Sequence, residues 1–161
     1  MGLFSFIKDA GEKLLGGASS EDQESANRSA SAAITAHVQS LQLPVTELHV
    51  AVEKAAHSAE VSGSVPDQET CEKVILACGN VEGIDSINDK LYIAGNNGAA
   101  TGEAVFHTVA GGETLSAIAK KHYGNANGYT AIFEANKPML KHPDKIYPGQ
   151  VLRIPPQTAS V

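Results

Sequence analysis

The spacing of the hydrophobic residues changes along the chain, and each change predicts a different element. In residues 23–41 the apolar side chains recur every three or four positions, which predicts a helix with one buried face. Pro44 stops any continuation of that helix. Residues 48–52 and 59–65 instead alternate apolar with polar side chains. Because that period is typical of half-buried strands, the two segments predict a β-hairpin.

A second helix and a third strand follow the hairpin. Asp67 is a candidate N-cap for a helix that runs to about Cys78, with Gly79 as its C-terminal stop. Residues 86–93 then predict a strand. The order of helix, strand, strand, helix and strand indicates an open α+β layer over residues 23–93.

The remainder of the chain predicts a second small unit. Residues 94–104 are small and polar without periodicity, which is typical of a linker. The elements expected after it are a strand at 106–109, a helix capped by Thr114 and ended by Gly124, a helix from Asn127 that breaks at Pro138, and a strand at 151–154. We therefore expect two α+β domains, at 23–93 and 105–155, followed by a tail at 156–161.

The first 22 residues contain apolar positions that predict a short amphipathic helix at the N-terminus. Charged residues such as Lys8 and Asp9 interrupt the apolar run too early for a secretory signal, and Phe6 stands where a myristoylation signal requires Ser or Thr. Such a helix could enter a lipid surface. We expect it instead to pack on the first domain and cover apolar surface there.

Charge and cysteine usage narrow the possible partners. The chain has 12 Lys and Arg against 18 Asp and Glu, and residues 1–100 alone carry six against fourteen. An acidic domain disfavours nucleic acids and anionic membranes as partners and favours cations.

Cys71 and Cys78 lie about 10 Å apart along one predicted helix, too far for a disulfide. Two free thiols without an export signal indicate the cytoplasm.

Residues 105–155 resemble the LysM module. The resemblance is carried by a Phe-His-Thr-Val strand, the helix start Gly-Glu-Thr-Leu-Ser at 112–116, the chain break Asn-Lys-Pro at 136–138, and the ending Pro-Gly-Gln-Val-Leu-Arg-Ile-Pro at 148–155. Two departures from the family pattern are Glu113 in place of Asp and the inserted Lys137.

The first domain resembles a BON domain, through its hairpin, the helix with Gly79 and Gly83, and the strand that follows. A BON domain followed by LysM, together with the opening segment of the chain, is similar to the bacterial cytoplasmic potassium-binding proteins. That resemblance implies a cytoplasmic sensor in K⁺ homeostasis, which binds K⁺ and larger monovalent cations and changes conformation. The main-chain carbonyl ligands that it implies are those of Ile7, Ala10, Glu12, Gly79, Val81 and Ile84.

The residue pattern is consistent with such a site. No Asp-x-Asp-x-Asp-Gly loop for a divalent ion is present, and neutral carbonyl dipoles can replace the hydration shell of K⁺. Carbonyl groups at a helix C-terminus carry partial negative charge, and residues 79–84 form such an end. Without the resemblance, Gly79 and Gly83 would be interpreted only as a helix cap and a turn glycine.

Two other functions remain open, and an enzyme is not expected. LysM modules of exported proteins bind N-acetylglucosamine chains, which here would involve Gly112, Glu113, Thr114, Leu115, Pro138, Met139 and Leu140. Exported BON proteins are associated with lipid surfaces. We expect this LysM to pack on the BON domain in a monomer. Catalytic motifs are lacking, and His49 and His122 are expected to be structural or exposed.

Overall fold

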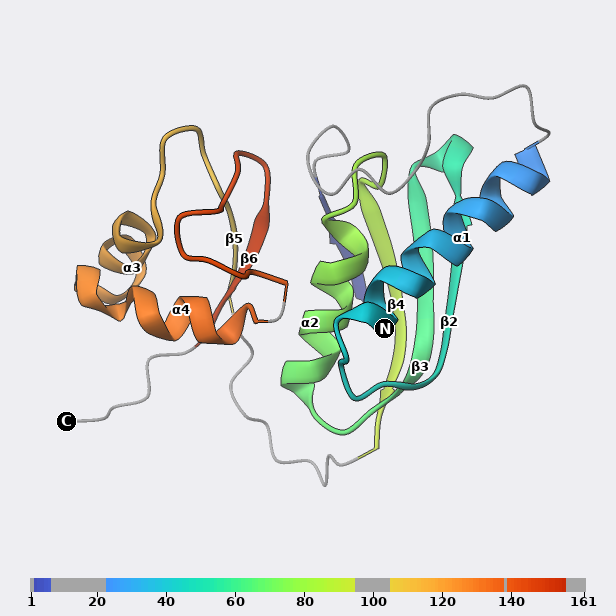
Figure 1. The fold of residues 1–161 in the computed structure, drawn as a ribbon, viewed down its shortest axis with the longest axis horizontal. Coiled ribbons are helices and arrows are strands. Elements are labelled where there is room, and N and C mark those ends of the chain that lie inside the picture. The colour runs from blue at the N-terminus through green and yellow to red at the C-terminus, as the bar shows by residue number, and fades with distance from the viewer. Residues whose placement is uncertain (1, 7–22, 95–104, 138, 156–161) are drawn as a thin grey trace. The chain divides into compact units, whose positions relative to one another are not determined.

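The computed structural model describes residues 2–6, 23–94, 105–137 and 139–155. The chain divides into two compact units, Met1–Asn97 and Gly98–Val161 (Figure 1). We call them unit 1 and unit 2, and each is described by itself.

Unit 1 is a four-stranded sheet with helices packed against it. Its elements are β1 (Gly2–Ser5), α1 (Gln23–Ser40), β2 (Thr46–Glu53), the 3₁₀ turn η1 (Lys54–Ala56), β3 (Ser58–Val65), α2 (Gln68–Gly79) and β4 (Ser86–Ile93). The strand order is β1-β4-β3-β2, in which β3 and β4 are parallel and the other neighbours are antiparallel. Helix α2 makes the crossover between the parallel pair (Figure 1). The predicted order of helix, hairpin, helix and strand is confirmed.

The core of unit 1 follows from the two periodicities in the sequence. Ile34 and Val38, one helical turn apart on α1, are fully buried. Val61 on β3 and Ile87 on β4 are also fully buried, on strands where buried and more exposed positions alternate. Helix α2 starts at Asp67, whose side chain accepts a hydrogen bond from Thr70 N–H at 2.7 Å, as predicted.

The N-terminus differs from the prediction. Gly2–Ser5 form strand β1, which pairs antiparallel with β4 from Gly2 opposite Asp89 to Ser5 opposite Ser86. The expected amphipathic helix is therefore wrong for these four residues. The Ser86–Asp89 half of β4 would otherwise present unpaired N–H and C=O groups at the sheet edge, and β1 pairs with that half. Residues 7–22, where the rest of the helix was expected, lie outside the described residues.

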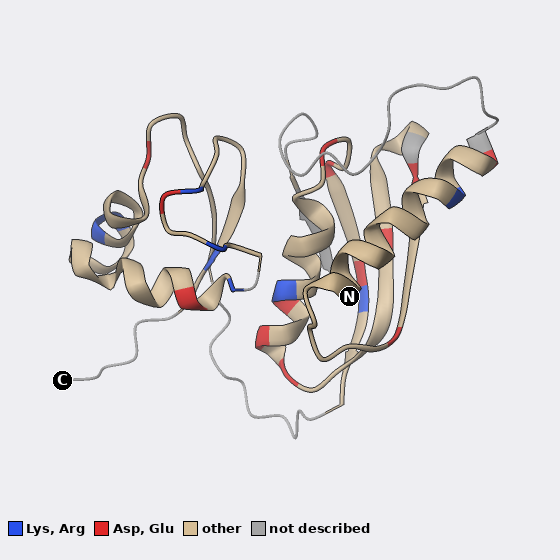
Figure 2. Ribbon diagram, in the orientation of Figure 1, with Lys and Arg blue, Asp and Glu red and all other residues tan. Residues whose placement is uncertain are grey.

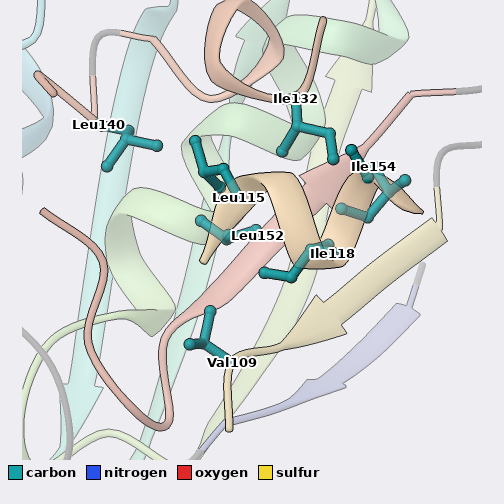
Figure 3. Close-up of a cluster of buried hydrophobic side chains, with 8 residues drawn as sticks. Val109, Leu115, Ile118, Ile132, Leu140, Leu152 and Ile154 are labelled. Carbon is teal, nitrogen blue, oxygen red and sulfur yellow. The ribbon is translucent and has the colours of Figure 1, made fainter. Parts of the chain in front are cut away.

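Unit 2 is a two-stranded antiparallel sheet with two helices. Its elements are β5 (Val105–Thr108), α3 (Leu115–Tyr123), the 3₁₀ turn η2 (Ala126–Gly128), α4 (Tyr129–Ala135) and β6 (Val151–Ile154). Thr114 caps α3 by accepting from Ala117 N–H, and Gly124 ends it in the left-handed region at φ 74°. Buried side chains from these elements and their loops form one core, shown in Figure 3. The predicted strand, helix, helix and strand are confirmed.

Candidate functional site

The loop that follows α2 is a tight turn built on buried side chains. Val81 and Ile84 are fully buried, and the Val81 carbonyl accepts a hydrogen bond from Ile84 N–H at 3.1 Å. Gly83 has φ 101°, a conformation that favours glycine. The helix itself includes Gly79, and Asn80 N–H closes its last turn on the Leu76 carbonyl. Of the predicted ligand residues, Gly79 is thus the last residue of α2, and Val81 and Ile84 lie in the turn that follows it.

His57 braces this loop from the turn that joins β2 and β3. Its carbonyl accepts hydrogen bonds from Asp85 N–H at 2.7 Å and from Ser86 N–H at 3.3 Å. Its ring Nδ1 lies 3.2 Å from the Gly83 carbonyl oxygen, and because a carbonyl only accepts, Nδ1 carries the proton. This role could not be predicted from the sequence, because His57 precedes the loop by more than twenty residues and no local motif marks it.

Phe6 connects the N-terminal strand to the same loop. Its N–H donates to the Asp85 carbonyl at 2.6 Å. Its ring lies directly over Gly79, where an added Cβ would overlap the ring carbon atoms. The backbone of Gly79 is not in the left-handed region, so its conformation does not require glycine. Glycine is needed at this position because the Phe6 ring leaves no space for a Cβ atom. The other predicted ligands, Ile7, Ala10 and Glu12, follow Phe6 in the chain and lie outside the described residues.

The electrostatics of the loop favour a cation. The C-terminal end of α2 directs its last carbonyl groups toward the loop, which concentrates partial negative charge there. Glu82 and Asp85 add two carboxylates, and Figure 2 shows acidic residues on the turn between α2 and β4. Two lysines of unit 1, on α2 and β4, are paired with carboxylates, Lys73 with Glu69 at 2.7 Å and Lys90 with Glu60 at 3.0 Å.

The side chains near the loop do not offer a conventional metal centre. Within the described parts of the chain, no three or more His, Cys, Asp or Glu residues come together in a way that could hold a metal ion. Burial raises the pKa of Cys78 to about 12, and burial together with Asp89 and Glu72 raises the pKa of Cys71 to about 12. Both thiols are therefore protonated at neutral pH and unsuited to bind metal, which requires the thiolate. Apart from the carboxylates of Glu82 and Asp85, the oxygen donors that we consider in this loop are main-chain carbonyls.

In unit 2, the residues predicted for glycan binding divide into loop and core positions. Gly112 has φ 84° and Thr114 is the helix cap, so both shape the turn before α3. The Glu113 carboxylate accepts from Ala110 N–H at 2.8 Å and lies 2.9 Å from the His107 ring. Those two hydrogen bonds, the backbone one foremost, hold the Glu113 pKa below its ordinary value.

The other predicted glycan contacts belong to the core or near it. Leu115 and Leu140 are buried in the cluster of Figure 3, so the structure does bring the two loops together through them. Their side chains are taken up by packing, which leaves only main-chain groups to meet a ligand. Met139 is half-buried, and Pro138 lies outside the described residues.

Comparison with known proteins places the chain in a family. Residues 107–155 match the LysM domain family. The protein named "Potassium binding protein Kbp" from Escherichia coli O6:H1 is 46% identical over 158 residues, which cover 96% of this chain and 99% of the relative. The chain belongs to the Kbp family. The aligned residues make up 96% of the chain and therefore extend over both units.

A second relative is similar over a shorter region. An uncharacterized protein of Deinococcus radiodurans is 46% identical over 55 residues, which are 34% of this chain and 21% of that protein.

In the described part of this Kbp family member, none of the helices combines the length and hydrophobicity needed to span a membrane.

Proposed function

We propose that this protein binds K⁺ through the main-chain carbonyl oxygens of Gly79, Val81 and Ile84 from the loop and of Ile7, Ala10 and Glu12 from the N-terminal segment. The close relative named as a potassium binding protein supports the identity of the ion. The observation that carries the site is the contact of Phe6 with Gly79 and Asp85, because it starts the N-terminal segment directly beside the loop.

The donor set explains a preference for K⁺ over divalent ions. Mg²⁺ gives up its bound water molecules reluctantly and is usually held by carboxylates at short distance. K⁺, in contrast, readily exchanges its hydration shell for neutral carbonyl dipoles. The loop supplies such dipoles from a rigid backbone, since Val81 and Ile84 are anchored in the core. Glu82 and Asp85 then raise the local concentration of cations without fixing the coordination geometry.

The division of the ligands between two chain segments predicts a conformational change. Three of the six proposed oxygens come from residues 7–12 and three from the loop, so a complete shell requires both segments to be together. An ion that binds only the docked arrangement stabilises it by mass action. We propose that this coupling makes the protein a cytoplasmic K⁺ sensor in K⁺ homeostasis, with a binding role rather than a catalytic one.

The domain assignment belongs to the same proposal. Residues 23–93 form a BON domain on which residues 1–22 pack, and residues 94–104 link it to LysM. The connectivity of α1, β2, β3, α2 and β4 supports the BON assignment.

Calorimetric titration of the desalted protein with KCl, NaCl and MgCl₂ at constant ionic strength tests the function. We expect saturable heat with K⁺ and none with Na⁺ or Mg²⁺, and we expect K⁺ to slow amide hydrogen exchange in residues 2–12 and 79–85. No heat with K⁺, or equal binding of Na⁺, would overturn the proposed function. Heat without protection of residues 7–12 would overturn the ligand set.

A second candidate function is glycan binding, which the LysM match at residues 107–155 favours. The main-chain groups of Gly112, Glu113 and Thr114 are the exposed or half-exposed candidates for it. Sedimentation with insoluble peptidoglycan tests this function. Retention that soluble N-acetylglucosamine oligomers displace would support it, and recovery of all the protein in the supernatant would exclude it.

A further inference from the structure

Two histidines of unit 2 meet although they lie fifteen positions apart. His107 projects from β5 and His122 from the last turn of α3. The Nδ1 atom of His107 lies 3.1 Å from the Nε2 atom of His122, and the two rings stand nearly perpendicular, at 88°. His107 is buried, whereas the residue His122 is exposed to solvent. One ring is thus held by the protein, and the other can adjust.

Glu113 determines which nitrogen of His107 carries the proton. Its Oε2 atom lies 2.9 Å from His107 Nε2 and also accepts from Ala110 N–H. An ionised carboxylate can only accept, so His107 Nε2 is the donor. In the neutral ring the lone pair is then on Nδ1, the atom that faces His122. A carboxylate that fixes the tautomer of a histidine in this way is the usual outer partner of a metal-ligating imidazole.

We propose that His107 Nδ1 and His122 Nε2 form a binding site for a divalent transition metal ion such as Zn²⁺ or Ni²⁺, with Glu113 as the positioning residue. Two imidazole nitrogens that bind one tetrahedral zinc ion at about 2.0–2.1 Å lie about 3.3 Å apart, close to the observed separation. The imidazole nitrogen is a preferred ligand of both metals.

Metal binding replaces the hydrogen bond between the two rings. His122 moves its proton from Nε2 to Nδ1, which leaves two lone pairs facing the ion, and no proton is lost in sum. The exposed His122 ring rotates to direct its lone pair at the ion. Water completes the coordination on the solvent side, so two protein ligands suffice for a site weaker than a structural zinc centre. Lys121 opposes a cation here, and the Glu113 carboxylate offsets that charge.

The test is calorimetric titration of the chelator-treated full-length protein with ZnCl₂ and NiCl₂ in a K⁺-free buffer. We expect one equivalent to bind, and the variant His122→Gln to weaken binding at least tenfold. Glu113→Gln retains both imidazoles and is expected to weaken binding by about 10–100-fold, as for other outer partners of metal ligands. The control is His142→Gln, an exposed histidine of the same unit, 3.8 Å from Asp144. It is expected to bind like the wild type.

A spectroscopic signature separates ligation from a structural effect. Nitrogen NMR of the imidazoles is expected to move His107 Nδ1 and His122 Nε2 on addition of Zn²⁺, while His107 Nε2 stays protonated. Wild-type affinity in His122→Gln, or equal loss in His142→Gln, would overturn the proposal. So would a spectrum in which another pair of nitrogens moves. The K⁺ titration of His122→Gln is expected to match the wild type, so failure of either proposal is recognised independently.

Discussion

The loop of unit 1 and the histidine cluster of unit 2 differ in the groups that they offer to a ligand. The loop at residues 79–84 offers main-chain oxygens, and its side chains serve to hold the backbone, as the buried Val81 and Ile84 show. The cluster offers side-chain nitrogens, and its backbone serves to bring His107 and His122 together. A main-chain site is therefore sensitive to packing and to glycine, whereas a side-chain site is sensitive to residue type.

The largest expected effect tests whether the two units fold independently. Asn136, buried in unit 2, donates to the carbonyls of Ile132 at 2.6 Å and Arg153 at 2.8 Å, and accepts from Arg153 N–H at 2.7 Å. Asn136→Ala removes these three buried hydrogen bonds and is expected to destabilise unit 2 by about 3 kcal/mol in the free energy of unfolding. Urea unfolding measures this loss. K⁺ affinity that falls along with it would show that the loop of unit 1 depends on unit 2.

The next effect concerns the aromatic contact on the loop. Phe6→Ala removes the half-buried ring from Gly79 and is expected to destabilise unit 1 by about 2 kcal/mol, below the cost of a fully buried phenylalanine. Weaker K⁺ binding is expected with it, because Phe6 directly precedes the proposed ligand segment and loses its contact with Gly79. Phe6→Leu should restore most of the stability. Tyr92→Ala, which truncates an aromatic residue that is 68% exposed, is the control and should change neither quantity.

The next smaller effect concerns the close contact between Gly79, at the end of α2, and the Phe6 ring. Gly79→Ala places a Cβ where the Phe6 ring lies, so the ring must move. We expect K⁺ affinity to fall about tenfold, equivalent to about 1.4 kcal/mol, in a calorimetric titration. Gly111→Ala is the matched control, because nothing lies within 4 Å of the added Cβ there. Unchanged K⁺ affinity in Gly79→Ala would show that K⁺ binding does not depend on the contact between Phe6 and Gly79.

The smallest effect concerns the turn beside the histidine cluster. Thr114→Ala removes the N-cap of α3 and is expected to destabilise unit 2 by about 1 kcal/mol in thermal unfolding. Thr114→Ser keeps the hydroxyl and should be close to the wild type. If both variants bind Zn²⁺ as the wild type does, the cluster depends on Glu113 and the two histidines rather than on the cap. A loss of Zn²⁺ binding in Thr114→Ala alone would instead make the cap part of the site.

Much of the fold could be predicted because its signals are local. The period of three to four that predicts α1, the alternation that predicts β2 and β3, and the caps at Asp67 and Thr114 each involve a few neighbouring residues. Strand β1 could not be predicted in this way. Its four residues are a strand because β4 offers them an edge more than eighty positions away, and a local pattern does not contain that edge.

The features of the candidate sites also divide into those that local sequence signals predict and those that depend on distant residues. Apart from strand β1, the sequence by itself determined the main helices and strands of both units, the LysM resemblance and the glycine-marked helix end, because caps, turns and periodicity act between near neighbours. The tertiary structure alone decided that Phe6 lies on Gly79, that His57 braces the loop, and that His107, Glu113 and His122 meet. Such contacts follow from how the sheet and helices pack. Packing brings together residues that are far apart in the chain, and their spacing in the sequence does not predict the contact.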